Sequence, residues 1–484
     1  MSQTIALQSL DEQNDNVLTF RLKAVIEDVQ ESTKLMYGSE KNPDGFPDGG
    51  LKANIVLLGS FIGLIADFGL ANSLGAIESY VSTHQLSHIK QTDVSWVFSL
   101  HLGVMYFGGV FFGELFDKFG ARIPLTIGMI ATTVGLLLTA QSTKLVHFIF
   151  SFSILTAIGT SLAMAPLIGA LSHWFLKKRA LACSIGTIGG LVGGTVFPVM
   201  LQNLYDKVGF IWGIRILALI CMFCMSVSIA LVRERDQKHN ASEISSPEVE
   251  SLTNQETENL SYHENEVSSR KNPFTSLVMF LKGALDFSVL KDSRFICLTL
   301  AIWLAEVISM TTLTYLSSYA LSNGLENSQA YLLITIVNVC GIPSRFISGL
   351  FADHYGRFNV MIVTSVMTTV VIFAVWLPAK GNLNILYAFA VLFGISTSAV
   401  ISLIPACTGQ ICSVDNFGKV YGTVYFFLAF LTILGMYIAS LVISGGSTTN
   451  YRNFVLYEGG LGAASIVLWI YARYTAVGWK WYKF

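Results

Sequence analysis

The chain has 484 residues, of which 53% are hydrophobic and 13% are charged. Soluble domains are about one quarter charged, so this composition excludes an ordinary soluble protein and predicts that lipid surrounds most of the chain. The net charge of −1 offers no basic surface for nucleic acid, and the seven cysteines show no Cys/His spacing that predicts a metal site or cofactor.

Apolar runs dominate the chain, and each is long enough for a spanning helix, which needs about twenty residues. In chain order the runs lie at residues 53–80, 94–115, 123–141, 146–171, 180–202, 211–232, 295–320, 329–352, 358–377, 384–406, 419–444 and 455–475. We therefore predict an all-α membrane protein with twelve transmembrane helices in two six-helix bundles.

A polar segment rich in Ser, Glu and Asn, roughly 236–272, separates the two sets of six runs. The expected parts are a polar N-terminal tail 1–52, a bundle 53–232, a largely disordered loop 233–294, a bundle 295–475 and a tail 476–484. Lys and Arg concentrate in the short loops on one side, which predicts that both termini are cytoplasmic. Two bundles around a central site are typical of secondary transporters.

A short signature occurs twice, after the second and the eighth apolar run. It reads GELFDKFGAR at 113–122 and GLFADHYGR at 349–357, and its key residues are Asp117, Gly120, Arg122, Asp353, Gly356 and Arg357. The glycines permit a tight turn, the aspartates can face the positive end of a neighbouring helix, and the arginines can pair with carboxylates. Contacts of this kind would form and break as one side closes and opens, so we expect these residues to gate the conformation.

This repeated signature resembles the loop signature of the major facilitator superfamily, and the resemblance covers about 48–475. Asp48-Gly49-Gly50 and the stretch HWFLKKRALA at 173–182, with the glycines after it, resemble the two signatures of the monocarboxylate-transporter family. The stretches at 63–73, 210–215, 337–345 and 477–484 are most similar to fungal homologues that carry riboflavin. The resemblance implies a non-enzymatic carrier of a small solute in the plasma membrane.

Three of those glycines, Gly186, Gly190 and Gly194, recur every four residues. One face of this helix therefore has no side chains, which predicts that another helix packs closely against it.

Ionisable groups inside the membrane are costly, so each is a candidate functional residue. Arg345 matches the arginine with which the monocarboxylate family binds its substrate carboxylate. Where that family has an aspartate this chain has Gly341, and where the animal carriers have a lysine it has Asn72. Of the arginine, aspartate and lysine with which that family binds an anion such as lactate and moves a proton, this chain has only the arginine. This favours a neutral, aromatic, polyhydroxylated solute such as a flavin.

A flavin needs a flat apolar surface for its rings and amide or hydroxyl groups for its polar edges. The expected substrate-binding residues are Arg345, Asn338, Tyr315, Glu306, Asn72 and Tyr425. Glu306 and Asp67 lie near the middle of their helices, and each is a possible proton site.

The favoured hypothesis is a secondary transporter that moves riboflavin, or a similar organic solute, by alternating access. Two alternatives stay open: a proton-coupled monocarboxylate transporter, and a nutrient sensor that does not transport. The chain shows no nucleophile–base set, metal cluster or phosphate loop, so we do not expect an enzyme. We expect the transport unit to be a monomer.

Overall fold

The computed structural model describes residues 47–175, 178–233, 287–411 and 417–478. The side chains at 112–114, 117–118, 287–288, 417–419 and 476–477 are outside this description. The chain divides into two units, and the described helices all belong to the one formed by residues 49–234 and 272–484. Residues 1–46 of the predicted N-terminal tail and 234–286 of the predicted central loop fall outside the described residues, and α2 begins within the predicted tail, at Gly50.

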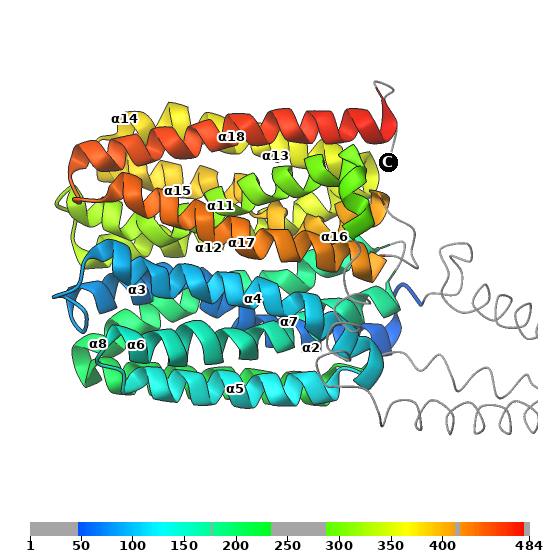
Figure 1. Cartoon of the computed structure of the whole chain (residues 1–484), viewed down its shortest axis with the longest axis horizontal. Helices are drawn as coiled ribbons and strands as arrows, with labels where there is room; N and C mark the ends of the chain where they lie inside the picture. The colour runs from blue at the N-terminus through cyan, green and yellow to red at the C-terminus, as the bar shows by residue number, and fades with distance from the viewer. Residues whose placement is uncertain (1–46, 176–177, 234–286, 412–416, 479–484) are drawn as a thin grey trace, which may run out of the picture. The chain divides into compact units, whose positions relative to one another are not determined.

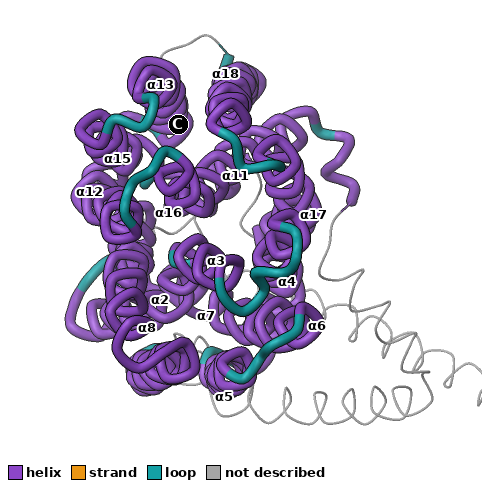
Figure 2. The backbone as a smooth tube through the Cα atoms, turned by 90° about the vertical axis from the view of Figure 1, so that its left-hand side faces the viewer, coloured by secondary structure: helices purple, strands orange, loops and turns teal. Residues whose placement is uncertain are grey.

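The described elements of regular secondary structure are helices (Figure 2). The N-terminal half contains α2 (Gly50–Asn72), α3 (Leu74–Thr83), α4 (Gln91–Phe119), α5 (Arg122–Ala140), α6 (Leu145–Phe148), the π-helical turn η2 (Ile149–Thr156), α7 (Ala157–Trp174) and α8 (Arg179–Leu231). The C-terminal half contains η3 (Phe287–Lys291), α11 (Ser293–Ser322), α12 (Asn327–Tyr355), α13 (Arg357–Val371), the π-helical turn η4 (Ile372–Trp376), α14 (Leu377–Ala379), α15 (Leu383–Thr397), α16 (Ala399–Ile411), α17 (Phe417–Ile443) and α18 (Thr448–Val477).

The number of membrane spans agrees with the predicted fold. Among the described residues, 11 helical stretches are long and apolar enough to cross a bilayer. The longest, α8, has 53 residues and is interrupted at Gly209, whose φ of 79° is not helical. Because α8 is therefore two spans, the prediction of twelve transmembrane helices is confirmed.

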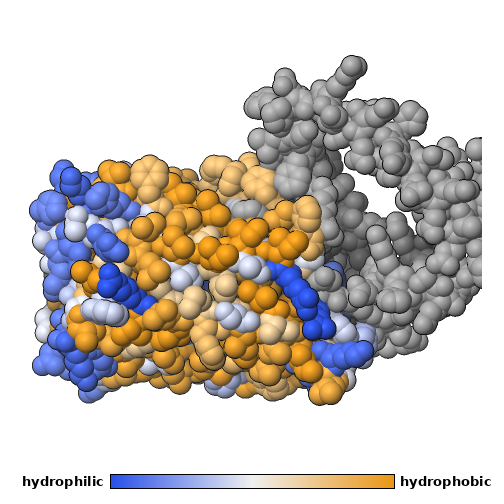
Figure 3. Space-filling view, turned by 90° about the horizontal axis from the view of Figure 1, so that it is seen from below, coloured by the Kyte–Doolittle hydropathy of each residue, from blue (hydrophilic) through white to orange (hydrophobic). Residues whose placement is uncertain are grey.

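Large apolar side chains remain exposed along the outer faces of the helices. Phe150, Phe223 and Val467 are 64%, 69% and 65% exposed. In Figure 3 hydrophobic residues cover most of the visible face, and hydrophilic residues gather toward its left-hand end. Such a surface is stable only against lipid, so the helices span a membrane.

The helices lie side by side, with the N-terminal half in the lower part of Figure 1 and the C-terminal half in the upper part. We call the side at which α2 begins and α18 ends the terminal side, and the opposite side, which carries α3, the distal side. Between the halves, α8 packs against α12 and α4 packs against α17.

Within the N-terminal half, α2 packs closely against α8, as the glycine spacing predicted. A methyl group added at Gly69 of α2 would lie 2.7 Å from the Cα atom of Gly193 of α8. The main chains of the two helices therefore touch, which side chains at these positions would prevent.

Candidate functional site

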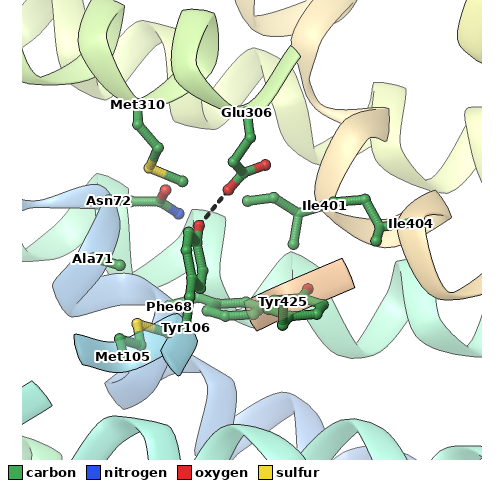
Figure 4. Close-up of a pocket in the computed structure, with 10 residues that line it drawn as sticks. All are labelled: Phe68, Ala71, Asn72, Met105, Tyr106, Glu306, Met310, Ile401, Ile404 and Tyr425. Carbon is green, nitrogen blue, oxygen red and sulfur yellow. Dashed lines mark hydrogen bonds between the residues drawn. The ribbon is translucent and has the colours of Figure 1, made fainter. Parts of the chain in front are cut away.

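A small cavity lies between the two halves (Figure 4). Its lining comes from α2, α4, α11, α16 and α17, so both halves contribute. The lining residues are Phe68, Ala71, Asn72, Met105, Tyr106, Glu306, Met310, Ile401, Ile404 and Tyr425. Mostly apolar walls with a few polar groups are typical of small-molecule sites. In this closed form the free space holds about one water molecule, so the halves must move apart before a solute can enter.

One hydrogen bond crosses this cavity from half to half. The hydroxyl of Tyr106, on α4, donates to the Oε1 atom of Glu306, on α11 (Figure 4). Both side chains are buried, and Oε2 of Glu306 has no hydrogen-bond partner among the described residues. A polar solute entering the cavity would find this carboxyl oxygen available.

Aromatic rings form one side of the same cavity. The ring of Tyr425, on α17, meets the ring of Tyr106 edge to face, with centroids 5.5 Å apart. The hydroxyl of Tyr421 donates to the Tyr425 hydroxyl at 3.2 Å. Flat rings with polar tips suit a solute that is itself aromatic on one part and polar on another.

Asn72, a predicted substrate-binding residue, lines the cavity, but its amide already makes a hydrogen bond. Its Nδ2 atom donates to the carbonyl of Gly190 at 3.1 Å, within the N-terminal half. Glu306, Asn72 and Tyr425 are therefore the three predicted substrate-binding residues that the fold brings together around one space.

Arg345 lies deep in the interface between the halves and is 2% exposed, but it does not line the cavity. Its Nη1 atom donates to the Thr187 carbonyl of α8 at 2.8 Å, and its Nε atom donates to the Ser398 carbonyl at 2.7 Å. Ser398 marks the break between α15 and α16. The charges of Arg345 and Glu306 are close enough to interact.

Asn338 also lies in the interface between the halves and does not line the cavity. Its Nδ2 atom donates to the Gly194 carbonyl of α8 at 3.1 Å and to the Ile334 carbonyl of its own helix at 3.0 Å. In a regular helix the residue four places after Gly194 would bond that carbonyl, but this residue is Pro198, which has no N–H. Asn338 supplies the missing donor from the other half.

The repeated signature lies at the terminal side. Gly120 and Gly356 follow α4 and α12 with φ of 72° and 96°, conformations that favour glycine. The Oδ2 atom of Asp353 accepts a hydrogen bond, at 3.3 Å, from the main-chain N–H of Leu181, in the first turn of α8. This carboxylate of the C-terminal half thus meets the positive end of a helix of the N-terminal half.

The other predicted gating residues differ in what the structure describes. The side chain of Asp117 lies outside the described part. Arg122 begins α5 and is exposed. The Nη1 atom of Arg357 donates to the carbonyl of Ala406 at 3.1 Å, so its described contact is within its own half.

Two further predicted residues, Asp67 and Tyr315, are buried at 1% exposure, outside the cavity lining. Asp67 packs inside the N-terminal half, and neither of its carboxyl oxygens has a hydrogen-bond partner among the described residues. Tyr315 lies toward the distal side of α11, where its ring meets Phe454 edge to face.

Sequence reasoning missed Tyr106 and Glu458. Tyr106 is one of 18 tyrosines, and no pattern distinguishes it in the sequence. Glu458 is a fully buried carboxyl in α18, and its Oε1 atom accepts from the Thr311 hydroxyl at 2.8 Å. The rule that an ionisable group inside a span is functional would have identified Glu458.

Comparisons with known proteins agree with this architecture. The family model of the Major Facilitator Superfamily matches residues 56–379 and 296–481. A riboflavin transporter of Saccharomyces cerevisiae is 36% identical over 94% of this chain and 85% of the relative, and an Aspergillus flavus transporter of the same superfamily is 29% identical over 92% and 91%. The crystal structure of the nucleoside transporter NupG aligns with a TM-score of 0.60 at 14% identity, over 87% of this chain and 100% of that one.

Proposed function

Because the chain belongs to the Major Facilitator Superfamily of membrane transporters, we propose that its solute is riboflavin or a similar planar, polyhydroxylated compound. Transport proceeds by alternating access across the plasma membrane. The transport unit is one chain, since residues of one chain line the cavity from both halves.

The observation that carries this proposal is the chemistry of the central cavity. The rings of Tyr106 and Tyr425 offer apolar surface, and Oε2 of Glu306 offers a hydrogen-bonding group without a partner among the described residues. A flavin combines a flat ring system with a polar ribityl chain, and this lining suits both parts. The riboflavin transporter among the relatives supports the same solute.

Contacts between the halves close the cavity on both the terminal and the distal side. Alternating access includes such a state, in which neither side is open. On the terminal side, Asp353 contacts the start of α8. On the distal side, α3 packs so tightly on α11 that a methyl group at Gly75 would lie 2.7 Å from the Leu313 carbonyl. Opening either side means breaking one of these contacts while the other persists.

We assign the terminal side to the cytoplasm. Arg122, Arg179, Arg233 and Arg357 all lie at helix ends on this side, and cytoplasmic loops of membrane proteins carry such an excess of positive charge. Both chain termini are then cytoplasmic, and the distal side faces outward.

The arrangement of Arg345 disfavours a monocarboxylate as the solute. A guanidinium that binds a carboxylate must present its donors to the cavity, but the described hydrogen bonds of Arg345 go to two main-chain carbonyls. Gly341, one turn earlier on α12, adds no carboxyl for a proton.

Uptake of labelled riboflavin tests the proposal in cells that lack their own riboflavin carriers, with labelled lactate as the comparison. We expect saturable riboflavin uptake and no lactate uptake. Glu306→Gln should weaken riboflavin binding while surface delivery is preserved. Lactate uptake without riboflavin uptake would refute the assignment, and binding of riboflavin without transport would indicate a sensor.

A further inference from the structure

A second group of buried polar side chains lies on the distal side, away from the cavity. It centres on Glu78 of α3, which is 2% exposed. The hydroxyl of Ser95, on α4, donates to its Oε1 atom at 2.6 Å. Glu78 belongs to α3, which follows the apolar span Gly50–Asn72 on the distal side.

The C-terminal half supplies the rest of this group. Tyr315 of α11 interacts electrostatically with Glu78 and lies near Ser440 of α17. Tyr451 of α18 also interacts electrostatically with Glu78. The group therefore exists only while α3 rests against the C-terminal half, that is, while the distal side is closed.

Oε2 of Glu78 is buried without a hydrogen-bond partner among the described residues, and the Tyr315 hydroxyl lies close to the hydroxyls of Ser95 and Ser440. The titratable groups facing Glu78 are the two phenols, Tyr315 and Tyr451, and its neighbour on α4 is a serine. No Lys, Arg or His of the described residues contributes to its electrostatics. A buried carboxylate without a cation is costly, whereas a protonated carboxyl is neutral and can donate a hydrogen bond.

We propose that Glu78 is a proton-binding site that controls the distal gate: it holds a proton while the distal side is closed and releases it to external water when that side opens. The inference rests on the proposed function, because only a carrier needs the distal side to open. It does not require a proton to cross the membrane with the solute.

The pH range over which the gate responds follows from the difference between the pKa of Glu78 in the closed state and in the open state. Burial raises the pKa of Glu78 from 4.5 to about 7 in the closed structure, and in an open, hydrated gate the pKa returns to its ordinary value. The open state then binds fewer protons, so raising the pH favours opening between about pH 4.5 and 7, with little change above. For these two pKa values the ratio of open to closed molecules rises roughly fortyfold from pH 5 to pH 7 and about twofold more beyond.

Distances between spin labels at Ser87→Cys and Ser328→Cys measure this ratio directly in liposomes between pH 5 and pH 8. Both positions are exposed at the distal ends of the two halves, and the measurement needs no solute. We expect the long-distance population to grow with pH as calculated. In Glu78→Gln, which cannot release a proton, the population should stay at its low-pH value throughout.

Asp93→Asn is the matched control, because it removes an exposed acid in the first turn of α4, also on the distal side. Asp93→Asn should leave the pH response intact. If Glu78→Gln fails to reach the membrane, Glu78→Asp is the second variant, and it should retain a pH response because it keeps a carboxyl group. A distribution that is constant from pH 5 to pH 8, or an unchanged response in Glu78→Gln, would overturn the proposal. A pH response in a protein that does not carry riboflavin would refute the solute assignment alone.

Discussion

Replacing Asn338 with leucine should favour separation of the two halves. The side chains have similar shapes, but leucine cannot donate to the Gly194 carbonyl, and Pro198 cannot donate to it either. Leaving a buried acceptor without a partner costs about 1–3 kcal/mol. That cost applies only while the halves are together, because water reaches the carbonyl once they part, so the ratio of closed to open molecules should fall about 5- to 150-fold.

A second substitution tests this explanation. Pro198→Ala restores a main-chain N–H that can bond the Gly194 carbonyl within α8. In that background the carbonyl has a donor in both states, so adding Asn338→Leu should have a much smaller effect on the ratio. The two substitutions should therefore be coupled by at least about 1 kcal/mol in a double-mutant cycle.

The assay is a distance measurement between labels at the terminal side, at Phe119→Cys and Tyr355→Cys. These residues end helices of opposite halves and are 56% and 54% exposed. The reasoning fails if Asn338→Leu leaves the distance distribution unchanged. It also fails if the shift is the same with proline or alanine at residue 198, because the carbonyl would then not be the cause.

Tyr106→Phe removes the hydroxyl that donates to Glu306 across the cavity. It should shift the equilibrium between closed and open molecules, read from the same distances, toward the open state by about 1–2 kcal/mol. Thr311→Val removes a comparable buried bond within one half, so it should lower thermal stability without that shift. Arg345→Lys should abolish uptake with normal surface delivery, because one ammonium cannot replace a guanidinium that bonds both halves; normal uptake would exclude this role. Asp353→Asn with Asp117→Asn should slow uptake of every solute alike, and an effect selective for one solute would show that these residues contact it.

The fold was predictable because lipid imposes a simple rule on the sequence. A span must satisfy its main-chain hydrogen bonds internally, so long apolar runs become helices at nearly the predicted positions. The breaks were not predicted: α2 ends at Asn72 with α3 after it, and α15 ends at Thr397 with α16 after Ser398. These breaks carry no strong sequence signal, since neighbouring helices and side chains supply the hydrogen bonds that they leave open.

The site was predictable only in part, because the side a residue faces depends on packing between halves. Glu306 was found from its charge alone, and the structure places it in the cavity. Arg345 was expected to meet the solute because of its charge and its match to the family, and Asn338 because of its amide, yet their described partners are carbonyls. A polar residue within an apolar run of the sequence indicates that its side chain needs a hydrogen-bond partner. The sequence does not show whether that partner is a ligand or the main chain.

The lack of a side chain at Gly194 of α8 explains why the partner of Asn338 is a main-chain atom. A methyl group at Gly194 would lie 2.9 Å from Oδ1 of Asn338, so this glycine lets Asn338 reach the carbonyl. Three hydrogen bonds between described residues of α8 and α12 involve the main chain of Leu181, Thr187 and Gly194. Hydrogen bonds between membrane helices are worth about 0.6–2 kcal/mol each, so three contribute roughly 2–6 kcal/mol. A solute bound with micromolar affinity releases about 8 kcal/mol, but only the part of this energy that differs between the open and closed states can shift the equilibrium between them. The solute must therefore bind one state more tightly by an amount comparable to these hydrogen bonds.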